Sequence, residues 1–420
     1  MVIKIKKNNF IDTILLLMMF AQLVILEFFG FGRIMNKLLA ILLILRMFFY
    51  PHKRKNNIIN FSMLLLSLFV FNLLFTGIGR MDIIKTNFLV IFYPYIYVCY
   101  VYFLCKQRPE FMDSLIRKMT IPLNVIMITN IIVLIIQINF PNMITAVITS
   151  NEIDYYEDTV SGLFEYGGTH IVCMFATTVV LYNFSMIKIL KEKKISKLLL
   201  LFTILIVTFV FGISTFNDNK AIYVILPIAL LVFLLAEMNN NFKRMYRIIL
   251  ILIVLIMVSI LSKDFYTFID ENIFSVYKMG AEAWNLGNSA NGSNERIAII
   301  IFAFTKISTW LCGTGFGNNV VYAEGYLGFK HFGQADFGSI LILGGVWFTI
   351  ILIYVYINMF NKIAIGNKKK GWVSFGITII FILSIIYTQC ITKTNCISCQ
   401  ILIAIAYRNV INNTRTEREC

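Results

Sequence analysis

The amino-acid sequence predicts an all-α polytopic membrane protein with about 12 transmembrane helices. Of its 420 residues, 59% are hydrophobic and 14% are charged, whereas soluble proteins carry about 45–50% apolar and about 25% charged residues. The mean hydropathy is +0.80, and apolar blocks alternate with short polar stretches along the whole chain. Only a lipid environment leaves so little need for a polar surface. A soluble enzyme, a fibrous protein, a disordered chain and a porin-like barrel are therefore excluded.

Each apolar block that can cross a hydrocarbon core of about 30 Å, which takes about 20 helical residues, is assigned as a span. The predicted spans cover residues 10–30, 33–50, 58–77, 87–105, 119–138, 167–187, 197–213, 221–237, 247–262, 335–357, 372–391 and 395–408. The first apolar run follows a basic start but lacks a small-residue cleavage site, so it is predicted to be a span rather than a removed signal peptide. The chain thus divides into spans 1–9 (residues 1–262), a large loop (263–334) and spans 10–12 with a tail (335–420).

The charges of the connecting segments orient these spans. The basic excess, 37 Lys plus Arg against 22 Asp plus Glu, is concentrated in short connections such as 53–55, 191–194 and 368–370. With the N-terminus inside, all of these short basic segments fall on the same side, as the positive-inside rule requires. We therefore expect a multi-pass protein of the cytoplasmic membrane with both termini in the cytoplasm. The basic excess sets topology and does not indicate nucleic-acid binding.

Two loops on the predicted outer side are longer than a connection requires. Residues 139–166 contain several acidic residues and no Lys or Arg, and residues 263–334 form the large loop. Loops of this length usually carry function. Within the large loop, residues 297–312 are apolar, but at 1.5 Å per residue they make a helix of only about 24 Å. A crossing there would also move the basic segment 367–370 outside, so we predict a short amphipathic or re-entrant helix.

Cationic or potentially cationic residues gather at the predicted outer ends of spans and in the large loop: Arg80, Lys220, Lys263, Arg296, Lys330 and His331. For each one alone, an anchor that snorkels to the lipid headgroups is the better explanation. Together they would suit a lipid-linked pyrophosphate, since Arg offers paired contacts to phosphate oxygens. His170 begins a span, where a histidine is more often a hydrogen-bonded interfacial residue than a catalytic one.

Two further motifs favour structural roles. Gly313, Gly315 and Gly317 are spaced like a phosphate-binding glycine loop, but a dinucleotide site needs a strand–turn–helix unit that this region lacks. We interpret these glycines as backbone freedom where the short helix ends and the chain returns to the membrane. Cys396 and Cys399 have CxxC spacing, yet they lie in a predicted span without a second pair, which favours packing over metal or redox chemistry.

Several segments resemble the Wzy-type repeat-unit polymerases of bacterial O-antigen and capsule polysaccharides, in the O-antigen ligase-like superfamily. The likeness is carried by Gly292-Ser293-Asn294-Glu295-Arg296, Gly313-x-Gly315-x-Gly317, Lys330-His331-x-Gly333-Gln334-Ala335-Asp336 and Leu343-Gly344-Gly345. The segments 161–165 (SGLFE) and 214–220 (STFNDNK) are further echoes. The hydropathy likeness covers the whole chain, and the motif likeness covers about residues 160–345. The chain departs from many ligases by having Lys220 where they have Arg.

The resemblance implies glycosyl transfer on the outer leaflet of the cytoplasmic membrane. A glycan on undecaprenyl pyrophosphate would pass to a hydroxyl of a new lipid-linked oligosaccharide, with no metal or other cofactor, and a chain-length regulator is a candidate partner. The expected catalytic residues are Arg296 and His331. The expected pyrophosphate- or glycan-binding residues are Lys220, Arg80, Lys330, Glu165, His170 and Asp336. The general base stays open among His331, Glu165 and Asp336.

Two other functions share this topology. A ligase would pass the finished glycan to a different acceptor, and a flippase for lipid-linked oligosaccharides would have a similar number of spans. Transporters tend to show internal repeats and polar or broken helices at the midplane. Here the middles of the spans are almost free of charge, with Arg46 the main exception, which favours the polymerase.

Overall fold

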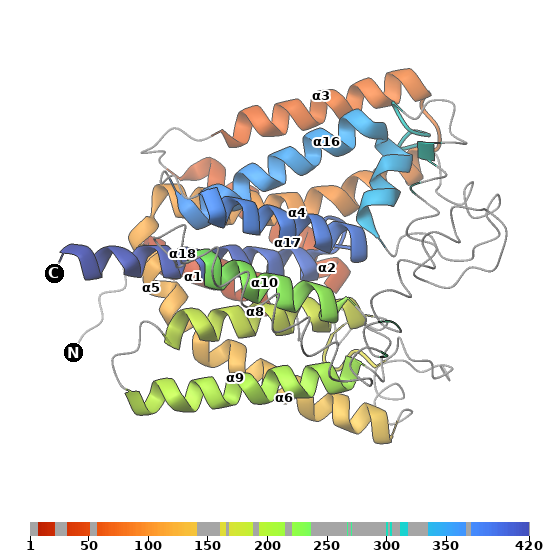
Figure 1. The fold of residues 1–420 in the computed structure, drawn as a ribbon. Coiled ribbons are helices and arrows are strands. Elements are labelled where there is room, and N and C mark those ends of the chain that lie inside the picture. Colours follow the sequence, from red (N-terminus) through yellow and green to blue (C-terminus); the bar gives the residue numbers. More distant parts are fainter. Residues whose placement is uncertain are drawn as a thin grey trace.

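The computed structural model describes residues 7–21, 32–50, 57–140, 160–164, 168–187, 193–214, 221–236, 311–317, 335–366 and 371–419, together with a few single positions between 267 and 304. These residues form helices joined by turns (Figure 1). In chain order the helices are α1 (Lys7–Ala21), α2 (Gly32–Phe49), α3 (Ile58–Thr76), α4 (Met81–Gln107), α5 (Pro109–Lys118), α6 (Thr120–Asn139), α8 (Thr169–Ile187), α9 (Lys193–Ser214), α10 (Ile222–Ala236), α16 (Asp336–Ile365), α17 (Gly371–Tyr387) and α18 (Thr394–Glu419).

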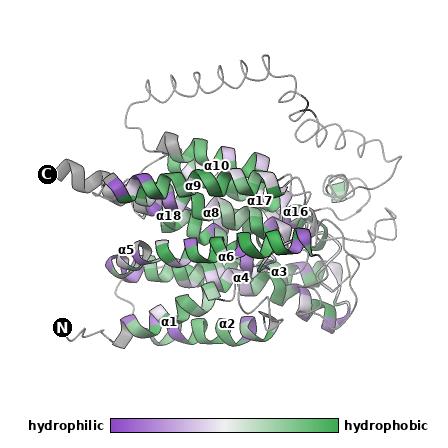
Figure 2. Ribbon diagram, turned by 90° about the horizontal axis from the view of Figure 1, so that it is seen from below, coloured by the Kyte–Doolittle hydropathy of each residue, from purple (hydrophilic) through white to green (hydrophobic). Residues whose placement is uncertain are grey.

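The prediction of a helical membrane protein is confirmed. Within the described residues, six helices are long and apolar enough to cross a bilayer: α3, α4, α6, α8, α9 and α16. A helix overlaps each predicted span except the ninth, residues 247–262, which lies outside the described residues, as does most of the predicted helix 297–312. The last helix is much longer than predicted: α18 continues past residue 408 to Glu419. Figure 2 shows hydrophobic residues along most of the helix lengths.

The two ends of the bundle differ. Helix α1 begins and α18 ends at one end, which we call the termini end, whereas α3 ends and α4 begins at the opposite end, which we call the loop end (Figure 1). The centre is built around α18, which packs against α4, α8 and α16, and α4 and α16 also pack against each other. It contains fully buried tyrosines such as Tyr97, Tyr182 and Tyr407. In a bilayer the hydrophobic effect does not drive helices together, so the helices associate through close packing, to which these large rings contribute.

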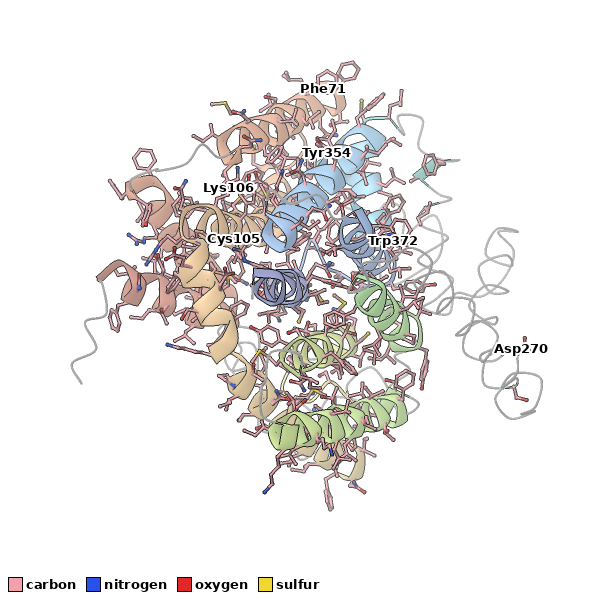
Figure 3. All side chains as sticks on the ribbon, turned by 60° about the vertical axis from the view of Figure 1, so that its left-hand side comes forward. Phe71, Cys105, Lys106, Asp270, Tyr354 and Trp372 are labelled. Carbon is pink, nitrogen blue, oxygen red and sulfur yellow. The ribbon has the colours of Figure 1, made fainter. Side chains whose placement is uncertain are left out.

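Helix α3 lies at the edge of the bundle. Asn72 is its buried residue, and apolar side chains such as Met63, Val70 and Phe71 are exposed along its length. Phe71 on α3, Tyr354 on α16 and Trp372 on α17 all lie at the outer surface of the bundle (Figure 3). Exposed large apolar side chains on spanning helices indicate surfaces that contact lipid.

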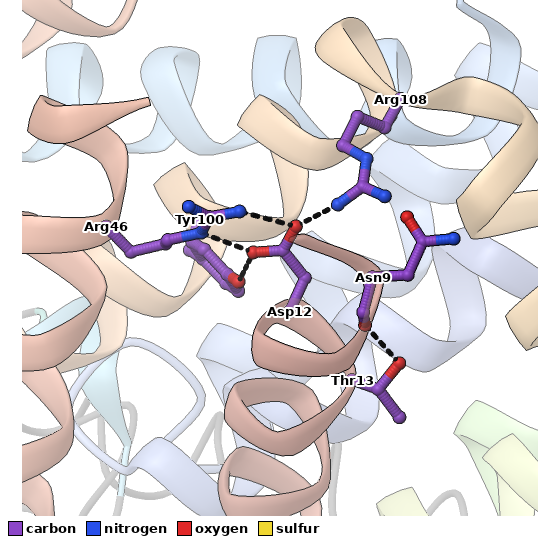
Figure 4. Close-up of polar contacts among 6 residues, drawn as sticks. All are labelled: Asn9, Asp12, Thr13, Arg46, Tyr100 and Arg108. Carbon is purple, nitrogen blue, oxygen red and sulfur yellow. Dashed lines mark hydrogen bonds and ion pairs between the residues drawn. The ribbon is translucent and has the colours of Figure 1, made fainter. Parts of the chain in front are cut away.

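A buried charge cluster joins helices near the termini end (Figure 4). Asp12 of α1 is fully buried, and its carboxylate accepts hydrogen bonds from the Arg46 guanidinium on α2 at 2.7 and 3.2 Å. The Tyr100 hydroxyl of α4 donates to the same carboxylate at 2.9 Å, and Arg108, directly after α4, also pairs with it. A charge at this depth is tolerated because every contact to it is charge-assisted or polar. The exceptional position of Arg46 inside a span is thereby explained.

Helix α5 lies between two predicted spans and begins at Pro109, a residue favoured at the first helical position. Asp113 of α5 accepts a hydrogen bond from the buried Arg408 of α18 at 2.7 Å, and Arg408 also donates to the Ile363 carbonyl of α16 at 3.2 Å. Arg408, which the sequence placed at the cytoplasmic end of the last span, thus fastens α18 to α5 and α16.

Candidate functional site

The candidate site begins with a break in a spanning helix. α16 is helical on both sides of Gly345, but Gly345 itself has φ +72° and ψ −176°, which interrupts the helical hydrogen bonding. The carbonyls before the break, those of Ile342 and Leu343, must then find donors elsewhere, because an unpaired carbonyl at membrane depth is costly. The two-glycine sequence Gly344-Gly345 permits this break, since φ > 0 is open to glycine at no steric cost.

The missing donors come from residues 311–317, which we call the glycine loop. Its backbone N–H groups at Thr314 and Gly315 donate to the carbonyls of Ile342 and Leu343 at 2.7 and 3.0 Å. The Thr314 hydroxyl donates to the Ile342 carbonyl as well, at 3.1 Å. The glycine loop therefore replaces the missing turn of α16 at the loop end of the bundle.

Two asparagines on neighbouring helices hold the glycine loop in place. Asn72 of α3 is 2% exposed; its amide donates to the carbonyls of Cys312 and Leu343, and its oxygen accepts from the Phe316 N–H at 3.3 Å. Asn87 of α4 donates to the Phe316 carbonyl at 2.9 Å. A side-chain amide can bridge donors and acceptors in this way because it carries both. Together they tie α3, α4 and α16 to one loop.

The glycines of this loop are needed where they stand. Gly313 has φ +74°, and a Cβ there would lie 2.5 Å from the Ile342 carbonyl oxygen and 2.6 Å from the Gly345 nitrogen. Gly315 has φ +95°, and a Cβ there would collide with the Thr76 side chain. The interpretation as backbone freedom is confirmed for Gly313 and Gly315, and close approach of two backbones is a further reason for glycine at 313 and 317.

Of the predicted site residues, Arg80 lies beside the glycine loop. Its backbone N–H donates to the Gly317 carbonyl at 3.2 Å, and Gly79 and Gly317 are packed backbone to backbone. The Arg80 side chain is 74% exposed and pairs with Asp82 at 2.6 Å, while Lys85 is exposed one turn further along α4. The Arg80 guanidinium is therefore presented to the surroundings at the rim of the loop end, beside a carboxylate that already engages it.

Asp336 and His170 have separate surroundings. Asp336 is 1% exposed at the start of α16 and accepts hydrogen bonds from the backbone N–H groups of Ile391 and Thr392 and from the Thr392 hydroxyl. Its own N–H donates to the Thr388 carbonyl at 3.1 Å. Asp336 therefore fastens the turn between α17 and α18 to α16.

His170 is half-buried in the first turn of α8. Arg296, His331, Lys220, Lys330 and Glu165 lie outside the described residues.

An apolar groove lies directly below the glycine loop, between α3, α4 and α16. Its volume is about 160 Å³, and its walls include Leu65, Phe69, Phe88, Phe92, Phe316 and Phe348. Phe316 of the glycine loop packs against Phe69 and Phe348 with ring centroids 4.9 and 5.0 Å apart. The loop that completes α16 thus also forms one end of the groove.

Asn72 and Asn87 were not singled out from the sequence. The available signal was their residue type, since a carboxamide within an apolar span is costly unless it finds partners inside the bundle. Their partners could not be read from the sequence, because Asn72 and Cys312 are 240 residues apart.

Comparison of the chain with protein-family models, with curated proteins and with solved structures finds no match.

Proposed function

We propose that the protein polymerises oligosaccharide repeat units carried on undecaprenyl pyrophosphate, on the outer leaflet of the cytoplasmic membrane. The observation that supports this proposal best is the contact between the glycine loop and the break in α16. Both segments, Gly313–Gly317 and Leu343–Gly345, belong to the motifs that resemble the Wzy-type polymerases, and they are hydrogen-bonded to each other through Thr314 and Gly315. Motifs that meet in space are better support for a shared site than motifs that only follow one another in sequence.

The proposed reaction is a single glycosyl transfer. A hydroxyl oxygen of the incoming repeat unit attacks the anomeric carbon that links the growing glycan to its carrier. A new glycosidic bond forms, the bond between that carbon and the pyrophosphate oxygen breaks, and undecaprenyl pyrophosphate leaves. The proton of the attacking hydroxyl passes to a general base. Cations placed where charge develops on the departing pyrophosphate lower the barrier.

The chain offers residues for both tasks. Arg296, Lys220 and Lys330 are the proposed cations, with Arg80 beside the glycine loop as a further one. His331 is the proposed base, because a histidine titrates near the pH outside the cell. The structure gives Asp336 another task, since both of its carboxylate oxygens accept hydrogen bonds from the turn after α17.

The test is the glycan made by cells that carry defined variants. Deletion of the gene should leave single repeat units on lipid and abolish long chains. Arg296→Lys should also fail, because a compact ammonium cannot reproduce bidentate contacts to phosphate. His331→Ala should lose roughly 10²–10⁴ in rate, with His331→Gln separating proton transfer from hydrogen bonding.

Matched controls are His52→Ala and Arg415→Lys, which change residues that we assign to the cytoplasmic side. Both should leave chain length unaltered at equal protein level. Normal chains in both Arg296→Lys and His331→Ala would overturn the residue assignment. A deletion strain in which lipid-linked units never reach the outer leaflet would indicate a flippase, and one with full-length but unattached polymer would indicate a ligase.

A further inference from the structure

The groove between α3, α4 and α16 has a polar end and an aromatic end. At its end nearer the termini end of the bundle, the groove is lined by the Ser62 hydroxyl of α3 and the Tyr95 hydroxyl of α4, which are 3.0 Å apart. Toward the loop end, the rings of Phe69 and Phe88 pack at a tilt with centroids 4.9 Å apart, and Phe316 lines the groove beside Phe69. The walls from Ser62 to Phe69 and from Phe88 to Tyr95 extend for about 10 Å at 1.5 Å per residue. The space is thus elongated along the helices.

The side of the groove is formed by a helix that faces lipid. Leu66 of α3 lines the groove and is 53% exposed, and its neighbours Met63 and Val70 are exposed as well. An apolar groove bordered by a helix that contacts lipid is accessible from the bilayer. A hydrocarbon chain of a lipid is therefore the matching occupant. The flat rings of the walls offer wide contact to such a chain and few partners for a sugar or a phosphate.

The rim above the groove carries a net positive charge in the part that the structure describes. Arg80 and Asp82 neutralise each other as an exposed ion pair, whereas Lys85, one turn before Phe88, is exposed. A cation at headgroup level attracts an anionic lipid. Lys85 is a single exposed ammonium and by itself offers no paired contacts that would select a pyrophosphate over a single phosphate. A lipid with one phosphate and apolar chains matches both this charge and the apolar walls of the groove.

We propose that the groove holds one acyl chain of an anionic glycerophospholipid, with its phosphate near Lys85, and that this lipid supports the glycine loop through Phe316. The groove adjoins the glycine loop through Phe316, but the assignment of its occupant does not depend on the proposed polymerase chemistry. We expect the bound acyl chain to pack against the Phe316 ring, which connects the glycine loop to Phe69 of α3 and Phe348 of α16.

The experiment is photolabelling in nanodiscs of phosphatidylglycerol and phosphatidylcholine, using phosphatidylglycerol with a diazirine in its acyl chain. Labelled peptides should come from the walls around Phe69, Phe88 and Phe92. Leu66→Trp fills the groove mouth and should lower this labelling several-fold. Leu74→Trp is the matched control, since Leu74 is 74% exposed on the same helix and does not line the groove. It should leave the labelling unchanged.

Further arms separate the lipid from other occupants. Lys85→Gln should reduce the preference for phosphatidylglycerol over phosphatidylcholine several-fold, and Leu66→Phe serves as the milder filling variant if Leu66→Trp folds poorly. Labelling spread evenly over the exposed face of α3 and insensitive to both filling variants would overturn the proposal. So would displacement of the label by undecaprenyl phosphate at a few per cent of total lipid, which would assign the groove to a polyprenyl chain. Cross-linking of two protein chains through α3 would assign it to a second copy.

Discussion

At the scale of single residues, Asp12 shows how a charge is kept in an apolar bundle. Its fully buried carboxylate contacts the guanidinium of Arg46 on α2, the hydroxyl of Tyr100 on α4 and the guanidinium of Arg108 directly after α4 (Figure 4). The arrangement need not stabilise the fold more than apolar side chains would. Removing one member nevertheless lowers the free energy of unfolding strongly, because it leaves an uncompensated buried charge.

Asp12→Ala should therefore lower the free energy of unfolding by about 3–5 kcal/mol, since Arg46 and Arg108 lose their shared partner. Thermal or denaturant unfolding in detergent measures the loss. Asp82→Ala is the matched control: Asp82 also pairs with an arginine, but its side chain is 65% exposed, and surface ion pairs contribute little. Equal melting of the two variants would contradict the role assigned to Asp12.

Gly313 allows a second residue-scale prediction. Gly313→Ala forces a side chain into positive φ, at about 1–2 kcal/mol, and adds a collision with the backbone of α16. We expect lower melting temperature and shortened glycan chains. Gly212→Ala in α9, where a Cβ meets open space, should leave both unchanged. If the Gly313 variant behaved like the Gly212 variant, the close approach of loop and helix would be wrong.

At the scale of elements, α3 is the helix that depends most on polar contacts. Many of its apolar side chains are exposed, those that face the bundle, such as Leu65 and Phe69, are only partly buried, and Asn72 is its buried residue. Its attachment to the bundle therefore concentrates at Asn72 toward the loop end and at Ser62, which contacts Tyr95, nearer the termini end. A helix that packs loosely along its length needs such points, because lipid provides no hydrophobic force to press it inward.

Asn72→Leu should release the glycine loop while α3 still spans the membrane. The measurement is the alkylation rate of Cys312, which is half-buried in the wild type, whereas the other described cysteines are buried. The rate should rise several-fold, because the Cys312 carbonyl and the Phe316 N–H lose their partner. Asn60→Leu, an exposed position on the same helix, is the control. An unchanged rate in Asn72→Leu would show that α4 and α16 suffice to hold the loop.

At the scale of the whole molecule, the chain returns to the end where it started. Helix α1 begins and α18 ends at the termini end of the bundle (Figures 1 and 2). This arrangement agrees with the loop charges, which assign both termini to the cytoplasm. With that predicted orientation, we expect the glycine loop, Arg80 and the groove to lie toward the outer leaflet.

Cysteine labelling in intact cells tests this orientation. In a version of the protein without its eight cysteines, Ile78→Cys at the loop end should react with an impermeant maleimide from outside, since Ile78 is 71% exposed. Lys368→Cys should react only after the membrane is opened. Labelling of position 368 in intact cells would reverse the orientation or change the number of spans.

The sequence by itself determined the fold class, the position of most helices and the backbone role of the glycines at 313 and 315, whereas the break at Gly345 came from the structure. These follow from composition, block length and backbone sterics, which act locally and are visible in any stretch of the chain. It also marked Arg46 as exceptional, since a charge inside a span is costly wherever it occurs.

Only the tertiary structure decided which polar groups meet. Asp12 receives Arg108 from 96 residues away, and Asn72 reaches the glycine loop across 240 residues. Such pairs depend on which helices pack side by side, and hydropathy alone leaves that choice open because every apolar face suits lipid and neighbouring helix alike. The groove below the glycine loop could not be predicted for the same reason. Its walls come largely from three helices, and the sequence of each one indicates only a membrane span.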